Sequence, residues 1–177
     1  MSTATHKPGS KSRPVLGLRQ RPGRLALQVM RLPRPLYHHG LGRLLDDTFL
    51  LITHQGRKTG NRRETVAMAV RYDANTHETI VCSAWGPNAD WIRNLQAHPA
   101  LRIQIGREAY VPQQRFLSDD EAVTVLTEFR RRHPKRSRLI AAILGWGDLT
   151  TEAAVQEFAR HRPFVSFRPP TSGPQLH

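Results

Sequence analysis

The sequence predicts an α+β protein in which an antiparallel β-barrel carries flanking helices. Short apolar or alternating runs bounded by turn residues recur through the middle of the chain, which is the pattern of strands. Most of these runs follow one another without an intervening helix, so antiparallel neighbours are expected and a doubly wound parallel sheet is not. The tally is about six strands and several helices.

A meander of three strands opens the predicted barrel. Compact runs rich in apolar residues predict strands at 49–54, 65–72 and 79–84. The segment 55–61 holds two glycines and two cations and is expected to be a loop, and 73–76 is expected to be a turn.

The next elements combine one helix with a second pair of strands. Residues 90–97 have helical spacing, and Pro99 stops that helix. Residues 101–105 alternate, which predicts a half-buried strand. After a turn at 106–108, one returning strand is expected over 109–117.

The C-terminal part reads mainly as helix. Ser118 followed by Glu121 has the form of a capping box, so a helix is expected from there to about residue 132, ended by Pro134. Further elements are expected at 139–144 (helix), 151–160 (helix) and 163–167 (strand).

The domain organisation follows from polar tails around this pattern. Residues 1–22 are basic and punctuated by proline, so they are expected to be a disordered tail. Residues 23–168 are expected to form a single domain, in which 25–32 and 37–45 are short helical stretches, and 169–177 to form a loose tail. No apolar run approaches the roughly 18 residues that span a bilayer, and no signal core is visible, so a cytoplasmic protein is expected.

The protein carries a large excess of positive charge. The formal net charge is +13, and no acidic residue precedes Asp46. Such an excess favours an anionic partner, which leaves open a nucleic acid, an anionic membrane surface and a phosphorylated small molecule. Nucleic acid is the unlikely choice, because no reading helix is recognisable and few aromatics interleave with the cations. The basic N-terminal segment with its stripe at 25–32 suits peripheral contact with an anionic membrane.

The loop of Gly56, Arg57, Lys58, Thr59 and Gly60 is the most informative segment. Glycines allow tight turns and close approach to a ligand, and cationic side chains bind phosphate or carboxylate oxygens. No helix pattern follows, so the loop is not a Walker loop. The alternative is a solvated hairpin loop that happens to be basic.

A second candidate region follows the third predicted strand. Ser83 and Ala84 are small enough to let a flat ring approach the backbone, and Trp85 or Trp91 could wall such a ring. The alternative for Trp91 is a core position. The single cysteine, Cys82, lies in an apolar run and reads as an inert core thiol. Histidine spacing does not suggest a metal site, and no nucleophile elbow is present.

Two of these segments together resemble the deazaflavin-dependent nitroreductase family of actinobacteria. The resemblance is carried by residues 50–66, which include the glycine-flanked loop, and by the helix start from Asp90 to Leu95, with Pro99 and Gly106. It implies a split β-barrel that binds coenzyme F420, with flavin mononucleotide as the alternative cofactor. It also implies hydride transfer from the reduced deazaflavin to an electron-poor acceptor such as a quinone. A homodimer and a non-catalytic binding or storage role remain open.

The resemblance also implies site residues. The grip on the cofactor's phosphate and tail would be formed by Arg57, Lys58, Thr59 and Arg63. The ring would lie along Thr65, Val66 and Met68, bordered by Cys82, Ser83, Ala84 and Trp85 and closed by Trp91 and Asn94. Residues 137–149 contain no tyrosine, and Trp146 is their only aromatic, which argues against the nitroimidazole reduction of the best-known members.

Overall fold

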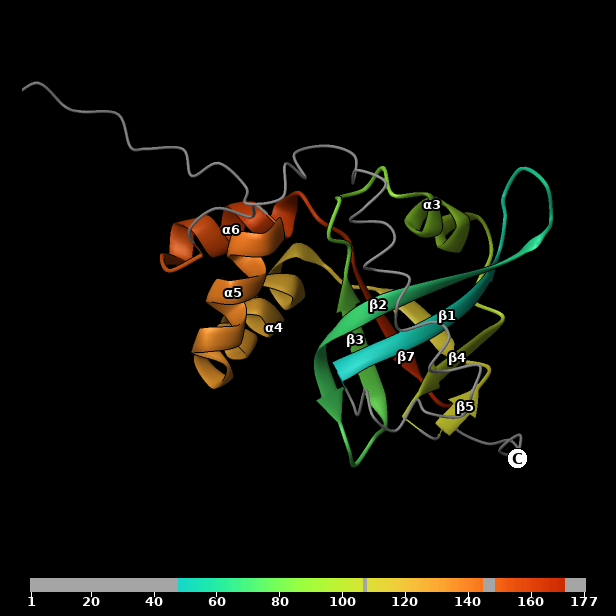
Figure 1. Ribbon diagram of the computed structural model, residues 1–177, viewed down its shortest axis with the longest axis horizontal. Helices are drawn as coiled ribbons and strands as arrows, with labels where there is room; N and C mark the ends of the chain where they lie inside the picture. Colours follow the sequence, from blue (N-terminus) through green and yellow to red (C-terminus); the bar gives the residue numbers. More distant parts are fainter. Residues whose placement is uncertain (1–47, 107, 145–148, 171–177) are drawn as a thin grey trace, which may run out of the picture.

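A meander of three antiparallel strands forms the centre of the sheet. The computed structural model describes residues 48–106, 108–144 and 149–170 (Figure 1). The three strands are β1 (Phe49–Gln55), β2 (Arg62–Asp73) and β3 (Glu78–Cys82). The strands expected at 49–54 and 65–72 are thereby confirmed, and so is the third, except that β3 ends at Cys82 and not at residue 84. β2 starts earlier than expected because its polar residues 62–64 are still paired with β1 through the backbone.

Four more strands complete a sheet of seven. They are β4 (Arg102–Ile105), β5 (Glu108–Tyr110), β6 (Gln113–Phe116) and β7 (Phe164–Arg168). The strand order is β5-β4-β1-β2-β3-β7-β6, and every pair is antiparallel. The strand expected near the C-terminus is confirmed as β7, which lies between β3 and β6.

The prediction of a single returning strand over 109–117 is wrong. The chain forms β5, which pairs with β4, and then β6, which pairs with β7 at the other end of the order. Pro112 lies between them and has no N–H for a ladder, so the strand breaks there. Because only Val111 and Pro112 join β5 to β6, the two edges of the sheet lie within about 11 Å of each other. The sheet therefore curls into the split barrel that was expected.

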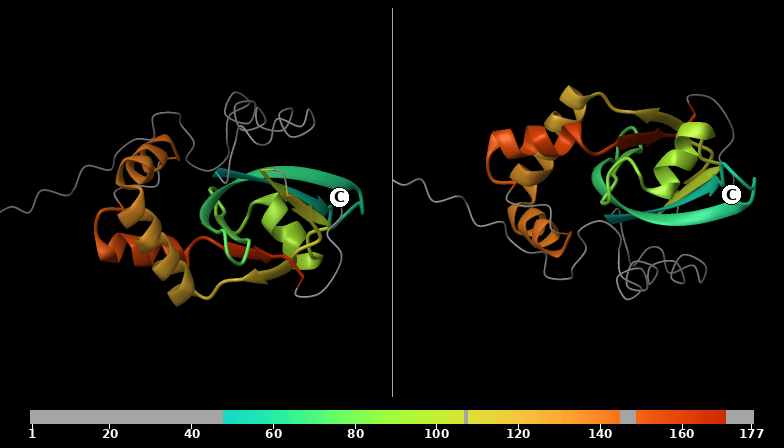
Figure 2. Two further views of the ribbon diagram at one scale, coloured as in Figure 1. Left: turned by 90° about the horizontal axis from the view of Figure 1, so that it is seen from below. Right: turned by 90° about the horizontal axis from the view of Figure 1, so that it is seen from above.

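Two apolar clusters form the core of the part of the chain that the structure describes. The first occupies the barrel interior and includes Leu50, Ile52, Ile103 and Phe167, and α3 (Asp90–Ala97) adds Trp91, Ile92 and Leu95 to it. The second joins the other face of β2 and β3 to the C-terminal helices. Figure 1 shows α4, α5 and α6 grouped beside the sheet and apart from α3, and both views in Figure 2 agree.

Two of the C-terminal helices, α4 and α6, begin at side-chain caps. α4 (Asp119–Arg132) has the predicted capping box, since Ser118 Oγ accepts from the Glu121 N–H at 3.3 Å and Glu121 Oε2 accepts from the Ser118 N–H at 2.9 Å. α5 (Pro134–Leu144) starts earlier than expected because Pro134 both ends α4 and suits a first helical turn. α6 (Glu152–Arg160) is capped by Thr151.

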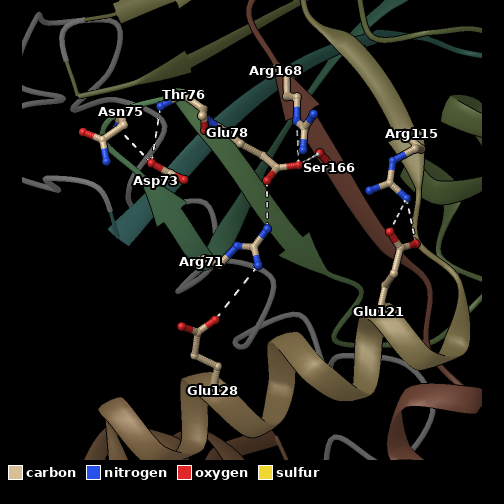
Figure 3. Close-up of polar contacts among 10 residues, drawn as sticks. All are labelled: Arg71, Asp73, Asn75, Thr76, Glu78, Arg115, Glu121, Glu128, Ser166 and Arg168. Atoms are coloured by element: carbon tan, nitrogen blue, oxygen red, sulfur yellow. Dashed lines mark hydrogen bonds and ion pairs between the residues drawn. The ribbon is translucent and has the colours of Figure 1, made fainter.

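A buried carboxylate ties the strands together beneath these helices. Glu78 on β3 is 3% exposed and accepts hydrogen bonds from Ser166 at 2.6 Å, from Arg168 at 2.8 Å and from Arg71 at 2.8 Å (Figure 3). Arg71 also lies 4.0 Å from Glu128 of α4. Burial by itself would raise the pKa of Glu78, but these three donors together lower it to about 2. The carboxylate is therefore a charged structural anchor between β2, β3 and β7.

Several expectations fall outside the described residues. These are the basic tail at 1–22, the helical stretches at 25–32 and 37–45, Trp146 and most of the C-terminal tail from 169 onward. No helix in the described part of the chain is both long and apolar enough to cross a membrane.

Candidate functional site

The glycine-flanked loop is a tight connection between β1 and β2. The Gly56 N–H donates to Asn61 O at 2.9 Å, and Gly56 O accepts from the N–H groups of Thr59 at 3.2 Å and Gly60 at 2.8 Å. Gly60 has a φ of +71°, a conformation that favours glycine. The loop is thus shaped by its own backbone hydrogen bonds, which leaves its side chains available for other contacts.

Three cations on or beside the loop have no acidic partner within the part of the chain that the structure describes. Lys58, Arg62 and Arg63 are exposed, and none of them forms an ion pair with the described residues. Arg63 passes over the turn, since a Cβ at Gly56 would lie 2.9 Å from Arg63 Nε. This donor set fits a group that carries phosphate or carboxylate oxygens.

Arg57 is placed differently from its cationic neighbours. Its Nη1 donates to Asn94 Oδ1 at 3.0 Å and lies 3.0 Å from Asp90 Oδ1, and its backbone N–H donates to the same Asn94 oxygen at 3.1 Å. Arg57 therefore fastens the loop to α3. Its Nε and Nη2 make no hydrogen bond with the described residues, which leaves one side of the guanidinium for a ligand.

A buried polar chain continues from Asn94 into the barrel. Asn94 Nδ2 lies 3.3 Å from His54 Nδ1, and His54 Nε2 lies 3.1 Å from Thr65 Oγ1. His54 is 2% exposed and Asn94 is 3% exposed. Burial lowers the pKa of His54; the backbone hydrogen bond at Gln55 opposes this effect, and Arg63 adds to it. The imidazole is therefore held neutral.

This polar chain was not predicted from the sequence, in which the histidines were considered only as metal ligands. A signal was present in the alternation of β1, which puts His54 on the same face as Leu50 and Ile52. A histidine on a buried face needs polar partners, and the neighbouring strand and α3 supply them in Thr65 and Asn94.

The residues expected along the ring lie on both faces of β2. Successive side chains of a strand point to opposite sides, so Thr65 lies with the barrel interior and Val66 and Met68 with the other face. Met68 and Cys82 both pack against the helix-side cluster. Val66, Met68 and Cys82 therefore lie toward the helix side of the sheet, whereas Thr65 belongs to the polar chain of Asn94 and His54.

The segment after β3 is held by a buried serine. Ser83 Oγ donates to Gly86 O at 2.7 Å, and the Ser83 N–H donates to Pro163 O at 3.0 Å. Ala84 and Trp85 lie half-buried in the resulting turn. Burial raises the pKa of the Cys82 thiol to about 12 although Arg162 opposes the shift, so the thiol is neutral.

Trp91 occupies a core position, which is the alternative to a cofactor contact that the sequence left open. Its side chain is 8% exposed and belongs to the barrel cluster. Among the residues expected on α3, Trp91 is therefore a core residue, and Asn94 reaches the loop through Arg57. The contact of either residue with a cofactor stays a prediction.

A match to a protein-family model shows which reaction this fold carries out. It spans residues 35–139, more than half of the 177 residues, and describes F420H2-dependent quinone reductases. The chain belongs to this family. It is an oxidoreductase that uses F420H2 as reductant and transfers a hydride from it to an acceptor. The deazaflavin resemblance, the cofactor and the enzyme class expected from the sequence are thereby confirmed.

Solved structures match over most of the chain. An F420H2-dependent reductase, FDR-A, is 19% identical over 70% of this chain and 96% of its own, with a TM-score of 0.47. A protein described as a domain-swapped dimer is 18% identical over 79% and 96%, with a TM-score of 0.48. A pyridoxamine 5'-phosphate oxidase-related, FMN-binding protein from Nostoc punctiforme is 12% identical over 86% and 83%, with a TM-score of 0.42. No curated protein matches.

Proposed function

We propose that the β1–β2 loop holds the anionic part of F420H2 and that the chain reduces a quinone. The observation that carries this proposal is a set of exposed cations, Lys58, Arg62 and Arg63, that form no ion pair with the described residues. They lie on or beside a loop that Arg57 fastens to α3. Such cations are free to pair with phosphate and carboxylate groups. Thr59 lies exposed in the same loop and offers a hydroxyl to the same ligand.

The ring is proposed to lie against the helix-side face of β2 and the turn after β3. Val66, Met68 and Cys82 offer apolar, half-buried contacts, and Ala84 and Trp85 continue that surface. F420H2 supplies the hydride, so no side chain needs to act as a nucleophile. The protein orients the ring and excludes water, and the neutral Cys82 thiol is a poor nucleophile that does not compete.

Cofactor binding tests the proposal directly. The intrinsic fluorescence of F420 is followed while full-length protein is titrated in, at low and at high salt. Micromolar or tighter affinity that weakens with salt is expected, and Lys58→Ala should weaken it about tenfold, the loss of one charge-assisted contact. Arg131→Ala is the control, because Arg131 is an exposed cation on α4 with no ion pair among the described residues. No binding to wild-type protein would sink the proposal.

A turnover assay identifies the acceptor and distinguishes a reductase from a storage protein. Reduced F420 is mixed with catalytic amounts of protein and a panel of quinones, nitroarenes and activated alkenes, and cofactor oxidation is followed by absorbance. A reductase oxidises the cofactor in proportion to the added acceptor, with quinones fastest. A storage protein binds it and shows no acceptor dependence, and a preference for flavin mononucleotide would instead favour the alternative cofactor.

Contact with an anionic membrane is a second proposal for this protein. The exposed Lys135, Arg138 and Leu139 lie on one face of α5, and Leu139 is 60% exposed. An apolar side chain among cations that form no ion pair with the described residues suits an anionic lipid surface. Co-sedimentation with vesicles that contain anionic lipid tests this, and Arg138→Glu should reduce it. Retention of the full chain by DNA instead would favour the nucleic-acid alternative.

A homodimer also remains a proposal, based on the exposed edges of the barrel. Light scattering coupled to size exclusion would measure the mass of the free and of the F420-bound protein. A mass near twice 20.1 kDa in both states supports it, and a monomer in both excludes it.

A further inference from the structure

One buried amide connects the cofactor loop to two other elements. Asn94 of α3 accepts two hydrogen bonds from Arg57 at Oδ1 and faces His54 of β1 with Nδ2. His54 in turn reaches Thr65 of β2. An asparagine suits this position because it combines an acceptor and a donor on one rigid group.

The donors of Arg57 determine the direction of the hydrogen bonds that lead from Asn94 through His54 to Thr65. Both groups of Arg57 can only donate, so the Asn94 oxygen faces Arg57 and its NH2 faces His54. His54 Nδ1 must then accept, which places the ring proton on Nε2, where it is donated to Thr65 Oγ1. Only one tautomer of a neutral His54 satisfies both Asn94 and Thr65.

We propose that Asn94 and His54 are positioning residues for the cofactor loop, acting through Arg57. The proposal rests on the function proposed above, in which Lys58, Arg62 and Arg63 bind the anionic part of F420H2. With Arg57 held at its backbone N–H and its guanidinium, the loop is ordered before the ligand arrives. Less conformational freedom is then lost on binding, which strengthens affinity without a new contact.

The alternative is that the hydrogen bonds from Arg57 through Asn94 and His54 to Thr65 only satisfy buried polar groups and stabilise the fold. The two readings differ in what an Asn94 variant does to binding. A stabilising role lowers the melting temperature and leaves the affinity of the folded protein unchanged. A positioning role weakens affinity for F420 and leaves kcat at saturating cofactor near wild type.

The binding experiment compares Asn94→Leu, Arg57→Gln and the double variant in F420 titrations below their melting temperatures. Each single change should weaken affinity about tenfold, and the double variant should be little worse than either, because both act through one contact. Asn88→Leu is the matched control, since Asn88 precedes the same helix but accepts from Arg93 and does not touch Arg57. Unchanged affinity in Asn94→Leu, or additive losses in the double variant, would overturn the inference.

A second readout needs no cofactor. In ¹⁵N-labelled wild-type protein at neutral pH, the imidazole of His54, assigned by its loss in His54→Gln, should show the neutral ring with its proton on Nε2. In Asn94→Leu that tautomer should no longer be enforced. A proton on Nδ1 or a charged ring in the wild type overturns the inference. If wild-type protein fails to bind F420 at all, the proposed function fails first, and this spectrum still reports whether the chain exists as described.

Discussion

Arginines serve opposite purposes in two regions of this molecule. Around β3 and β6 their charges are compensated by carboxylates of the protein: Arg71 and Arg168 meet the buried Glu78, and at the surface Arg115 meets Glu121 at 2.7 Å (Figure 3). Beside the β1–β2 loop, Arg62 and Arg63 have no such carboxylate in the described part of the chain. The difference teaches that a basic residue indicates a ligand only where the fold leaves its charge uncompensated.

The largest effect on stability is expected at Glu78, which compensates the charges of two arginines. Glu78→Gln leaves Arg71 and Arg168 beside a neutral group and should lower the free energy of unfolding by about 3 kcal/mol, as breaking a buried ion pair does. Urea unfolding followed by circular dichroism measures this loss. F420 affinity of the folded variant should stay at the wild-type value, and a loss of affinity would break the comparison.

The same carboxylate predicts a dependence of stability on pH. The pKa of Glu78 is lowered from 4.5 to about 2, so its stabilisation is fully present above pH 4.5 and is lost as the pH falls toward 2. Unfolding free energies of wild type and Glu78→Gln measured across this range should therefore converge in acid. Parallel curves would mean that Glu78 does not titrate as the structure requires.

A matched pair of arginines sharpens the comparison. Arg63→Ala should weaken F420 binding about tenfold and change stability by less than about 0.5 kcal/mol. Arg168→Ala should do the reverse, lowering stability by about 1 to 2 kcal/mol with affinity unchanged. Fluorescence titration and urea unfolding on both variants decide the matter, and similar profiles for the two would remove the distinction.

The smallest effect belongs to a helix cap remote from the loop. Ser118→Ala removes the acceptor for the Glu121 N–H and should lower stability by about 1 kcal/mol. Affinity for F420 should not change, since α4 and the loop share no contact among the described hydrogen bonds. Urea unfolding checks the first value, and the titration serves as the internal control.

Local signals predicted most of the described fold. The meander, α3 and the capped start of α4 each have a clear pattern over consecutive residues, and their positions are confirmed within a few residues. The break between β5 and β6 was missed because strand pattern does not say which neighbour a strand takes. Residues 113–116 pair with a strand that lies some 50 positions later, and no local pattern reports such a partner.

The candidate site was predicted less evenly. The exposed cations of the loop were found because glycines and charges stand together in the sequence. The clamp between Arg57 and Asn94 was missed because it depends on how α3 packs over the barrel. Likewise, Glu78 gave no signal, since two of its three partners, Ser166 and Arg168, come from β7, whose pairing with β3 is non-local.

The two-residue link at Val111 and Pro112 bears on the order in which the protein can fold. β6 leaves that link with no neighbour until β7 arrives, because β7 separates it from β3. The pairing of Ile80 with Ser166 closes a long loop of chain, and such contacts form late. During synthesis, residues up to 168 must therefore leave the ribosome before the barrel can close, and α4, α5 and α6 are made while β6 still lacks its neighbour β7.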